Sequence, residues 1–461
     1  MLKTETTRYA GHVLFLNPPS EPPLYRGIVC TWVSKARYIW QPFDFILLSA
    51  QVPASMQVSY LDSAIHRMTI KDTLRFIREK TVTQLVMSMS SIVWDKDKAA
   101  LVSLRDAFPK LSIAVFGDIF QEKAFVEQVL PLKVTVIRHP LDPGIAGYFR
   151  TGEVSSPALL QKLDGALDSL PPLALKQSVE LPLPRHEAFL NTKHRSPFDK
   201  YRRSAIVTIS WGCPYPCSYC SWSSPYLPFV HKSAQSVIGE LELLRRLNVK
   251  EIFFSDLSFG FPSEAAKEVL KAMISRDWKF SWHCYIKAGS LSEEFLAMMR
   301  QAGCHTVIMG IESDDLNLSK FNRRVSLQDI IKTIALCHGL KIDVCGDFIL
   351  GLNGLADNWK ELTEFAINLK LDFASFNIYT PLLGSLERYR KIKEGVIQEG
   401  EWGYDTTGYR KSLIEHSENR AKCVKKFYGR PAYWLKRLSK IKTPEEFLIK
   451  LQEAANLFLP K

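Results

Sequence analysis

Short apolar segments rich in Val, Ile and Leu recur along most of this 461-residue chain, with amphipathic segments between them. Apolar runs that lack polar alternation are typical of strands buried on both faces of a parallel sheet. The intervening segments 69–80 and 96–108 repeat apolar residues at helical spacing. Because parallel neighbours need helical crossovers, the pattern predicts an α/β protein.

A first series of strands and helices fills residues 1–150. Alternation of this kind predicts a Rossmann-like, doubly wound sheet. Residues 151–200 are rich in Pro, Leu and Ser and are predicted to form a linker. The strands expected in this first series are 12–17, 57–62, 83–90, 111–117 and 133–138.

A second series occupies residues 201–390, where the clearest helical patterns are 234–247, 292–303 and 327–340. Strand–helix units that recur about every 25 to 45 residues favour a partial TIM barrel, (β/α)6, over an open sheet. Ligands of such barrels bind at the C-terminal ends of the strands. The expected barrel strands are 204–210, 251–256, 280–287, 305–312, 343–351 and 373–380.

Cys213, Cys217 and Cys220 directly follow the first barrel strand, in a segment rich in Pro and Tyr. A structural zinc site wants four ligands, and the other six of the nine cysteines are scattered singly. A disulfide would leave an odd thiol. An iron–sulfur cluster on three thiolates would leave one iron open for a substrate or cofactor. The spacing therefore favours a cluster, with a zinc or structural site as the alternative.

This C-x3-C-aromatic-x-C motif, with Tyr219 as its aromatic residue, resembles the radical SAM superfamily. The resemblance implies a [4Fe–4S] cluster whose open iron chelates S-adenosylmethionine (SAM). Reductive cleavage of SAM then gives a 5'-deoxyadenosyl radical, with a reductant such as flavodoxin or ferredoxin as partner. It also implies that the backbone of Tyr219 contacts the adenine.

Further positions of the barrel match the family's pattern individually. Asp256 and Ser258, in "SDLSFG", resemble the segment at the methionine end of SAM. Lys287 and Arg323 resemble basic residues near the SAM carboxylate, and Glu312, in "GIES", resembles the residue that faces the ribose. For Asp256, Lys287 and Arg323, a surface charge or an internal salt bridge remains an open alternative. Glu312 ends an apolar strand, where an unpaired carboxylate is costly, so a ligand contact is favoured.

A Rossmann-like domain before such a barrel resembles the cobalamin-binding class of radical SAM enzymes. Ser88, Ser90 and Gly117 follow strand ends and are expected to lie together along one sheet edge, facing the mouth of the barrel. They are the expected contacts for cobalamin.

Two features depart from the cobalamin pattern. Asp62 and His66 do not form the Asp-x-His-x-x-Gly motif, so no histidine is expected beneath the cobalt. Asp118 replaces a glycine that the pattern expects, and a side chain there is predicted to crowd the corrin ring. Asp118→Gly is accordingly expected to strengthen cobalamin binding.

The resemblance implies cobalamin-dependent methylation of an unactivated carbon in a small-molecule, lipid or tetrapyrrole substrate. The alternative is a cobalamin-independent radical rearrangement or C–C bond reaction, with the N-terminal domain as a scaffold. Either reading makes the chain an enzyme.

The net charge of +12 is uneven, since residues 391–461 hold 15 Lys and Arg against 9 Asp and Glu. This basic, helical C-terminal tail suits an RNA-modifying or RNA-binding protein, but also a solvated helical face. Nucleic acid is not the favoured partner, because no RNA-binding module follows the barrel. There is no apolar run of about 18 residues, so no transmembrane segment is expected. The N-terminus suits a strand better than a signal peptide, which predicts a cytoplasmic protein.

Overall fold

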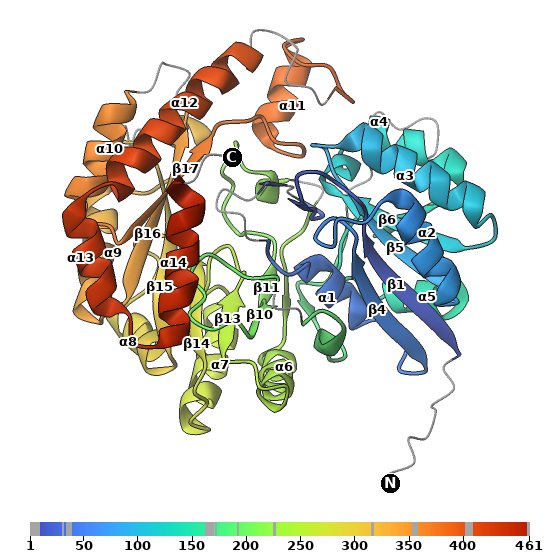
Figure 1. Ribbon diagram of the computed structural model, residues 1–461, viewed down its shortest axis with the longest axis horizontal. Coiled ribbons are helices and arrows are strands. Elements are labelled where there is room, and N and C mark those ends of the chain that lie inside the picture. The colour runs from blue at the N-terminus through green and yellow to red at the C-terminus, as the bar shows by residue number, and fades with distance from the viewer. Residues whose placement is uncertain are drawn as a thin grey trace. The chain divides into compact units, whose positions relative to one another are not determined.

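The computed structural model divides into two compact units (Figure 1). The described residues up to Lys193 form the first, together with Leu227 and Pro228, and the other described residues form the second. The predicted linker thus belongs mainly to the first unit, and the C-terminal helices belong to the second. Parts of the predicted linker (162–169) and tail (402–408) lie outside the described residues. The structure describes residues 10–29, 32–33, 39–161, 170, 173–190, 193–224, 227–314, 318–352, 358–401 and 409–458.

The first unit is built on a six-stranded sheet of order β4-β1-β5-β6-β7-β8. Its first five strands are parallel, which confirms the doubly wound fold. The sixth strand, β8, joins β7 antiparallel and was not predicted. The strands are β1 (Gly11–Asn17), β4 (Met56–Asp62), β5 (Gln84–Met89), β6 (Ser112–Gly117), β7 (Thr135–Ile137) and β8 (Leu159–Leu160), with short strands β2 (Leu24–Tyr25), β3 (Trp32–Val33) and β9 (Ser178–Val179) outside this sheet.

The central strands of this sheet are apolar on both faces, as a helix-covered parallel sheet requires. Val13, Leu14, Phe15 and Leu16 of β1 are all fully buried. The predicted strand 133–138 is shorter, because Lys133 still belongs to a left-handed turn with φ of 56°. The covering helices are α1 (Phe43–Ser49), α2 (Ile70–Glu79), α3 (Trp94–Ala107), α4 (Lys123–Val129) and α5 (Ile145–Thr151).

The second unit contains six parallel strands that pair in chain order, which confirms the partial barrel. The sheet begins at β10 and ends at β17, so these two strands form its open edges. The strands are β10 (Ser204–Val207), β13 (Glu251–Phe254), β14 (Ser281–Ile286), β15 (Cys304–Glu312), β16 (Asp343–Leu350) and β17 (Phe373–Ile378). The helices that follow them are α6 (Ala234–Arg246), α7 (Ser263–Ser275), α8 (Glu293–Gln301), α9 (Leu327–Gly339), α10 (Trp359–Asn368) and α11 (Leu386–Lys393).

The first barrel strand ends earlier than predicted. The backbone N–H groups of Ile209 and Ser210 donate to the Asp256 carboxylate at 3.0 and 2.6 Å, instead of continuing the ladder with β13. The chain then forms β11 (Ser210–Trp211), which pairs antiparallel with β12 (Val230–Lys232). This break directs the chain into the cysteine loop.

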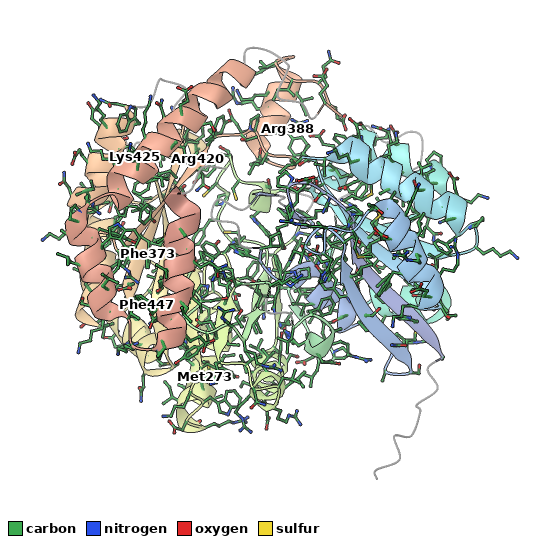
Figure 2. All side chains as sticks on the ribbon, viewed as in Figure 1. Met273, Phe373, Arg388, Arg420, Lys425 and Phe447 are labelled. Carbon is green, nitrogen blue, oxygen red and sulfur yellow. The ribbon has the colours of Figure 1, made fainter. Side chains whose placement is uncertain are left out.

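The C-terminal tail is helical, as predicted, and packs on the barrel. The Tyr428 hydroxyl accepts from the N–H of Ala374 at 3.1 Å and donates to its carbonyl at 2.8 Å. The Arg437 guanidinium lies 4.2 Å from the ring centroid of Phe373, which Figure 2 labels on β17. Among the described residues, no helix is long and apolar enough to span a bilayer. The tail helices are α12 (Tyr409–Tyr428), α13 (Pro431–Lys440) and α14 (Pro444–Phe458).

Candidate active site

The three motif cysteines lie in the loop that follows β11, at the C-terminal end of the barrel. None of the three forms a disulfide with another described residue, and Cys217 is buried while Cys213 and Cys220 are partly exposed. Cys217 packs with Tyr219 in a buried apolar cluster that includes Phe321. The backbone N–H of Ser218 donates to the Phe321 carbonyl at 2.9 Å. The loop is therefore held by the segment that follows β15.

The geometry of these thiols fits a cluster better than a single ion. Thiolates on one zinc ion would lie about 3.8 Å apart, given a Zn–S distance of about 2.3 Å. Among the described residues, Cys213, Cys217 and Cys220 do not form a group whose ligand atoms all lie within 4.8 Å of one another. Burial raises the pKa of the Cys213 and Cys220 thiols. Thiolates at these two positions would need a bound cation, which a multi-iron cluster supplies.

Arg323 connects the cysteine loop to the end of β15. Its Nη1 lies 3.9 Å from the Cys217 sulfur, and its Nη2 lies 3.4 Å from Glu312 Oε1 and donates to the Gly310 carbonyl. Burial disfavours the charge, but Glu312, Tyr219 and Cys217 outweigh it and raise the pKa of Arg323. The guanidinium therefore stays charged beside the cysteine loop.

The Nε atom of Arg323 is a buried donor that makes no hydrogen bond. A permanently charged guanidinium with a spare N–H is suited to bind an anion such as a carboxylate. The residues present thus fit the expected SAM carboxylate at this position.

Glu312 is held in a conformation that few side chains adopt. Its φ is 73°, in the left-handed region, and its carboxylate is hydrogen-bonded to the Tyr219 hydroxyl. A Cβ at Gly310 would lie 2.4 Å from Glu312 Oε1 and 2.9 Å from Arg323 Nη2, so a side chain there would displace both charged groups. Backbone strain of this kind persists where the surroundings enforce it, and it is enriched at ligand sites.

Two further predicted residues reach the same loop through Tyr215. The Lys287 ammonium lies 3.8 Å from the Tyr215 ring centroid, and Ser258 is hydrogen-bonded to the Tyr215 hydroxyl. Burial, followed by the nearby charge of Arg323, lowers the pKa of Lys287. Sequence reasoning missed Tyr215 and Gly310, although both stand inside the quoted motifs.

The Asp256 carboxylate is hydrogen-bonded within the barrel. Its carboxylate is fully occupied by the N–H groups of Ile209 and Ser210 and by the Ser210 hydroxyl, which lies 2.8 Å away. We therefore expect Asp256 to brace the start of the cysteine loop, not to contact a ligand.

In the first unit, the predicted contacts do lie along one sheet edge, since Met89 is in register with Gly117. Whether this edge faces the barrel stays a prediction. Ser88 Oγ lies 3.3 Å from Asn17 Oδ1, and the Ser90 N–H donates to Asp97 at 2.8 Å. A Cβ at Gly117 would lie 2.1 Å from the Met89 carbonyl oxygen, so strand packing requires glycine there.

The Asp118 side chain is hydrogen-bonded to Ser91. Its carboxylate accepts from the N–H of Ser91 at 2.9 Å and from the Ser91 hydroxyl at 2.7 Å. We therefore expect Asp118→Gly also to loosen the loop after β5, and its effect on cobalamin binding stays a prediction. Asp62 likewise accepts from Asn17 Nδ2 at 3.0 Å and from Tyr60 at 2.8 Å, and His66 is exposed.

Residues 207–366 match the family model of the radical SAM superfamily, and this segment contains the cysteine loop, Glu312 and Arg323. Curated relatives of this chain include an uncharacterized methyltransferase of Pyrococcus horikoshii, 28% identical over 60% of this chain and 62% of the relative. A bacteriochlorophyllide d C-12(1)-methyltransferase of Chlorobaculum tepidum is 24% identical over 59% and 65%, respectively. A hopanoid C-3 methylase of Methylococcus capsulatus is 24% identical over 51% and 48%. The chain thus spans less than two thirds of the length of each.

Two solved structures share the fold of this chain over most of its length. The radical SAM methyltransferase TsrM from Kitasatospora setae, solved with cobalamin and a [4Fe–4S] cluster, has a TM-score of 0.61 at 16% identity and covers 84% of this chain and 79% of its own. The cobalamin-dependent radical enzyme OxsB has a TM-score of 0.60 at 14% identity, over 97% and 71%. At these identities the likeness concerns the fold alone.

Proposed function

We propose that this chain is a radical SAM methyltransferase that transfers a methyl group to an unactivated carbon. The observation that carries this proposal is the group formed by the three-cysteine loop, Glu312 and Arg323 at the C-terminal end of the barrel. Three thiolates leave one iron of a cluster for SAM, and Arg323 keeps a spare donor beside it.

When bound, the reduced cluster supplies the electron that cleaves SAM to a 5'-deoxyadenosyl radical. Cys213, Cys217 and Cys220 would hold the cluster. Arg323 would orient the SAM carboxylate through its free Nε–H, and Glu312 would accept hydrogen bonds from the ribose.

The buried cluster of Cys217, Tyr219, Leu318, Phe321 and Leu352 flanks this group. Apolar packing of this kind excludes water, which protects a reactive radical from side reactions.

The substrate class is a tetrapyrrole, a lipid or another small apolar molecule. This part of the proposal is supported by the names of two relatives, which act on a bacteriochlorophyllide and a hopanoid. We further propose cobalamin as the methyl carrier, held by the first unit, since the fold of that unit is shared with two cobalamin-dependent proteins. A cytoplasmic flavodoxin or ferredoxin would provide the electron.

A second candidate is a cobalamin-independent radical reaction in which the first unit acts as a scaffold. It is favoured by the internal hydrogen bonds of Ser88, Ser90 and Asp118, which occupy the polar groups of the predicted edge. An RNA-binding role has less support, because cationic side chains of α13 are engaged with Asp343 and Asp372 of the barrel.

The test uses anaerobically reconstituted protein with dithionite and SAM that carries a deuterated methyl group. We expect 5'-deoxyadenosine from the wild type and none from Cys217→Ala. With hydroxocobalamin, we expect a bound-cobalamin spectrum and deuterated methyl transfer to a chlorophyllide or hopanoid acceptor.

Each half of the proposal can fail separately in this experiment. Formation of 5'-deoxyadenosine without cobalamin uptake would replace methylation by the second candidate. Absence of 5'-deoxyadenosine from protein with a full cluster would overturn the radical SAM assignment itself.

A further inference from the structure

A second group of metal-ligating side chains lies at the opposite end of the barrel from the cysteine loop. Glu251 is the first residue of β13, His283 lies in β14, and His305 is the second residue of β15. Their ligand atoms all lie within 4.8 Å of one another. The side chains of Glu251 and His283 are fully buried, and that of His305 is 5% exposed.

A bulge in the sheet brings these three residues together. Trp282 is in register with Cys304 and His283 with Thr306, so His305 is an extra residue in β15. A bulge re-aims the side chain of the strand that carries it. Here it lets His305 reach Glu251, a residue of a strand that is not its neighbour in the sheet.

The distances suit one small ion. Ligands at about 2.0–2.1 Å from a tetrahedral zinc ion lie about 3.3 Å from one another. Glu251 Oε1 lies 2.9 Å from His305 Nε2 and 3.5 Å from His283 Nδ1. One carboxylate oxygen thus stands at ligand distance from both rings.

His283 is the observation that points to a ligand. Its Nε2 makes no hydrogen bond although the side chain is fully buried, and its Nδ1 faces Glu251 Oε1 at 3.5 Å. Phe253 stacks on the ring at 4.6 Å between centroids, and the Phe198 ring meets it edge-on at 5.7 Å. A buried imidazole with so little hydrogen bonding is costly, and a metal ion would give Nδ1 a strong partner.

The surroundings resemble the outer shell that metal ligands need. His305 Nδ1 lies 2.8 Å from the Thr306 hydroxyl, which fixes the ring, and Nε2, now 2.9 Å from Glu251 Oε1, would act as the ligand once its proton is released. Glu251 Oε2 accepts from the Lys200 N–H at 3.1 Å, which orients the carboxylate.

We propose that Glu251, His283 and His305 bind one divalent transition-metal ion, with zinc as the best fit, independently of the iron–sulfur cluster. Two imidazoles and a carboxylate form a donor set that zinc accepts. Because the site is buried, the ion would enter during folding and would tie β13, β14 and β15 together at the closed end of the barrel.

The experiment uses the full chain with a tag that contains no histidine, expressed with added zinc. The Cys213→Ala, Cys217→Ala, Cys220→Ala triple variant serves as the background, because it removes the cluster iron. We expect about one zinc per chain by elemental analysis. Adding Glu251→Gln should reduce this at least fivefold, whereas His338→Gln, which alters a half-exposed His–Asp pair, should leave it unchanged.

Folded background protein that holds less than a tenth of a zinc per chain would overturn the proposal, as would zinc retained in the Glu251→Gln variant. If that variant does not fold, X-ray absorption of the zinc in the background protein decides. A shell of nitrogen and oxygen that includes two imidazoles supports the site, and sulfur in the shell overturns it.

Discussion

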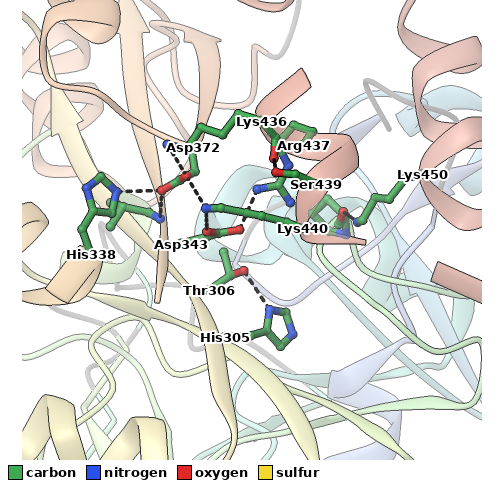
Figure 3. A network of polar contacts seen from close by, with 12 residues as sticks. His305, Thr306, His338, Asp343, Asp372, Lys436, Arg437, Ser439, Lys440 and Lys450 are labelled. Carbon is green, nitrogen blue, oxygen red and sulfur yellow. Dashed lines mark hydrogen bonds and ion pairs between the residues drawn. The ribbon is translucent and has the colours of Figure 1, made fainter. Parts of the chain in front are cut away.

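The two ends of the barrel use their charged side chains differently. At the C-terminal end, the two terminal nitrogens of Arg323 contact Gly310, Glu312 and Cys217. Its buried Nε–H makes no hydrogen bond. At the N-terminal end, Asp372 is saturated: His338 lies at 2.8 Å, and Lys436 and Lys440 both lie at 2.9 Å (Figure 3).

The comparison distinguishes charged side chains that are available to bind a ligand from charged side chains whose ion pairs stabilise the fold. Asp372 and Asp343 stand where β17 and β16 begin, and helix α13 supplies Lys436, Arg437 and Lys440 to them (Figure 3). Barrel residues at this end generally contribute to stability, whereas those at the other end contribute to chemistry. The buried His283 is unsatisfied although it lies at the stabilising end, which is why we propose a metal ion there.

The largest expected effect on SAM cleavage comes from the cysteine loop. The Cys213→Ala, Cys217→Ala, Cys220→Ala variant should lose the cluster iron, about four per chain in the wild type, and should form no 5'-deoxyadenosine. Iron analysis and chromatography of the reaction products measure both. Cys337→Ala, which alters another buried free thiol, should keep both. Iron retained at the wild-type level in the triple variant would contradict the assignment.

Arg323→Lys should have the next largest effect. Lysine keeps the charge but cannot reach Gly310, Glu312 and a ligand at the same time, so the affinity for SAM should fall about 10- to 100-fold. The iron content should be unchanged, since Arg323 is not a cluster ligand. Equilibrium binding of SAM to reconstituted protein measures this, with the exposed neighbour Arg324→Lys as the matched control. Equal affinities in the two variants would remove Arg323 from the SAM site.

Asp256→Asn should act on the cysteine loop indirectly. The amide keeps only one acceptor oxygen for the N–H groups of Ile209 and Ser210, so the loop loses about 1–3 kcal/mol of stabilisation. Cluster occupancy should fall several-fold, while the rate per bound cluster should stay the same. Asp277→Asn, at a position that is 76% exposed, is the control. A changed rate at full occupancy would instead indicate that Asp256 contacts the ligand.

Asp372→Asn should leave SAM cleavage unchanged and lower only the stability, by about 1–2 kcal/mol, since its lysine partners are partly solvated. Burial opposes the charge on Asp372, but hydrogen bonds from His338, Lys440, the Val344 N–H and Lys436 outweigh it and hold its pKa well below the usual range. Because the folded-state pKa is depressed, this stabilisation is present above the unfolded pKa of about 4 and is lost as the pH falls below it.

Thermal unfolding between pH 3 and 7 tests this last expectation. The difference in melting temperature between wild type and Asp372→Asn should be largest near neutral pH and should shrink below about pH 4. Asp106→Asn, at an exposed position, should show no such difference. A difference independent of pH would mean that the ion pairs do not stabilise the bottom of the barrel.

Much of the fold was predictable because its signal is local. Apolar runs such as residues 111–117 and 305–312 correspond closely to β6 and β15. A strand that is buried on both faces consists almost entirely of apolar residues, so its sequence is easy to recognise. The break after Val207 was not predictable, because it depends on Asp256, a residue 46 positions from Ser210. The antiparallel strand β8 contains only two residues and carries no pattern of its own.

The candidate site was predicted in part for the same reason. The spacing of Cys213, Cys217 and Cys220 is a local motif, and the structure places Lys287, Ser258, Glu312 and Arg323 around the loop that carries them. The direction in which a polar side chain points depends on which hydrogen-bond partner the fold brings near it, and the sequence alone does not show that partner. Asp118 and Asp256 each bond to a backbone N–H, a donor that sequence spacing does not reveal.

The sequence by itself determined the order of strands and helices, the doubly wound and partial-barrel folds, and the three-thiol motif. Each of these features depends on a pattern of residues that are close together in the sequence. Only the tertiary structure decided which charges are satisfied and which remain available. Arg323, Asp372 and His283 are all polar residues that the barrel buries, yet their partners come from different strands and helices. Burial makes each missing hydrogen bond costly, so the unsatisfied groups are the ones that mark a place for a ligand.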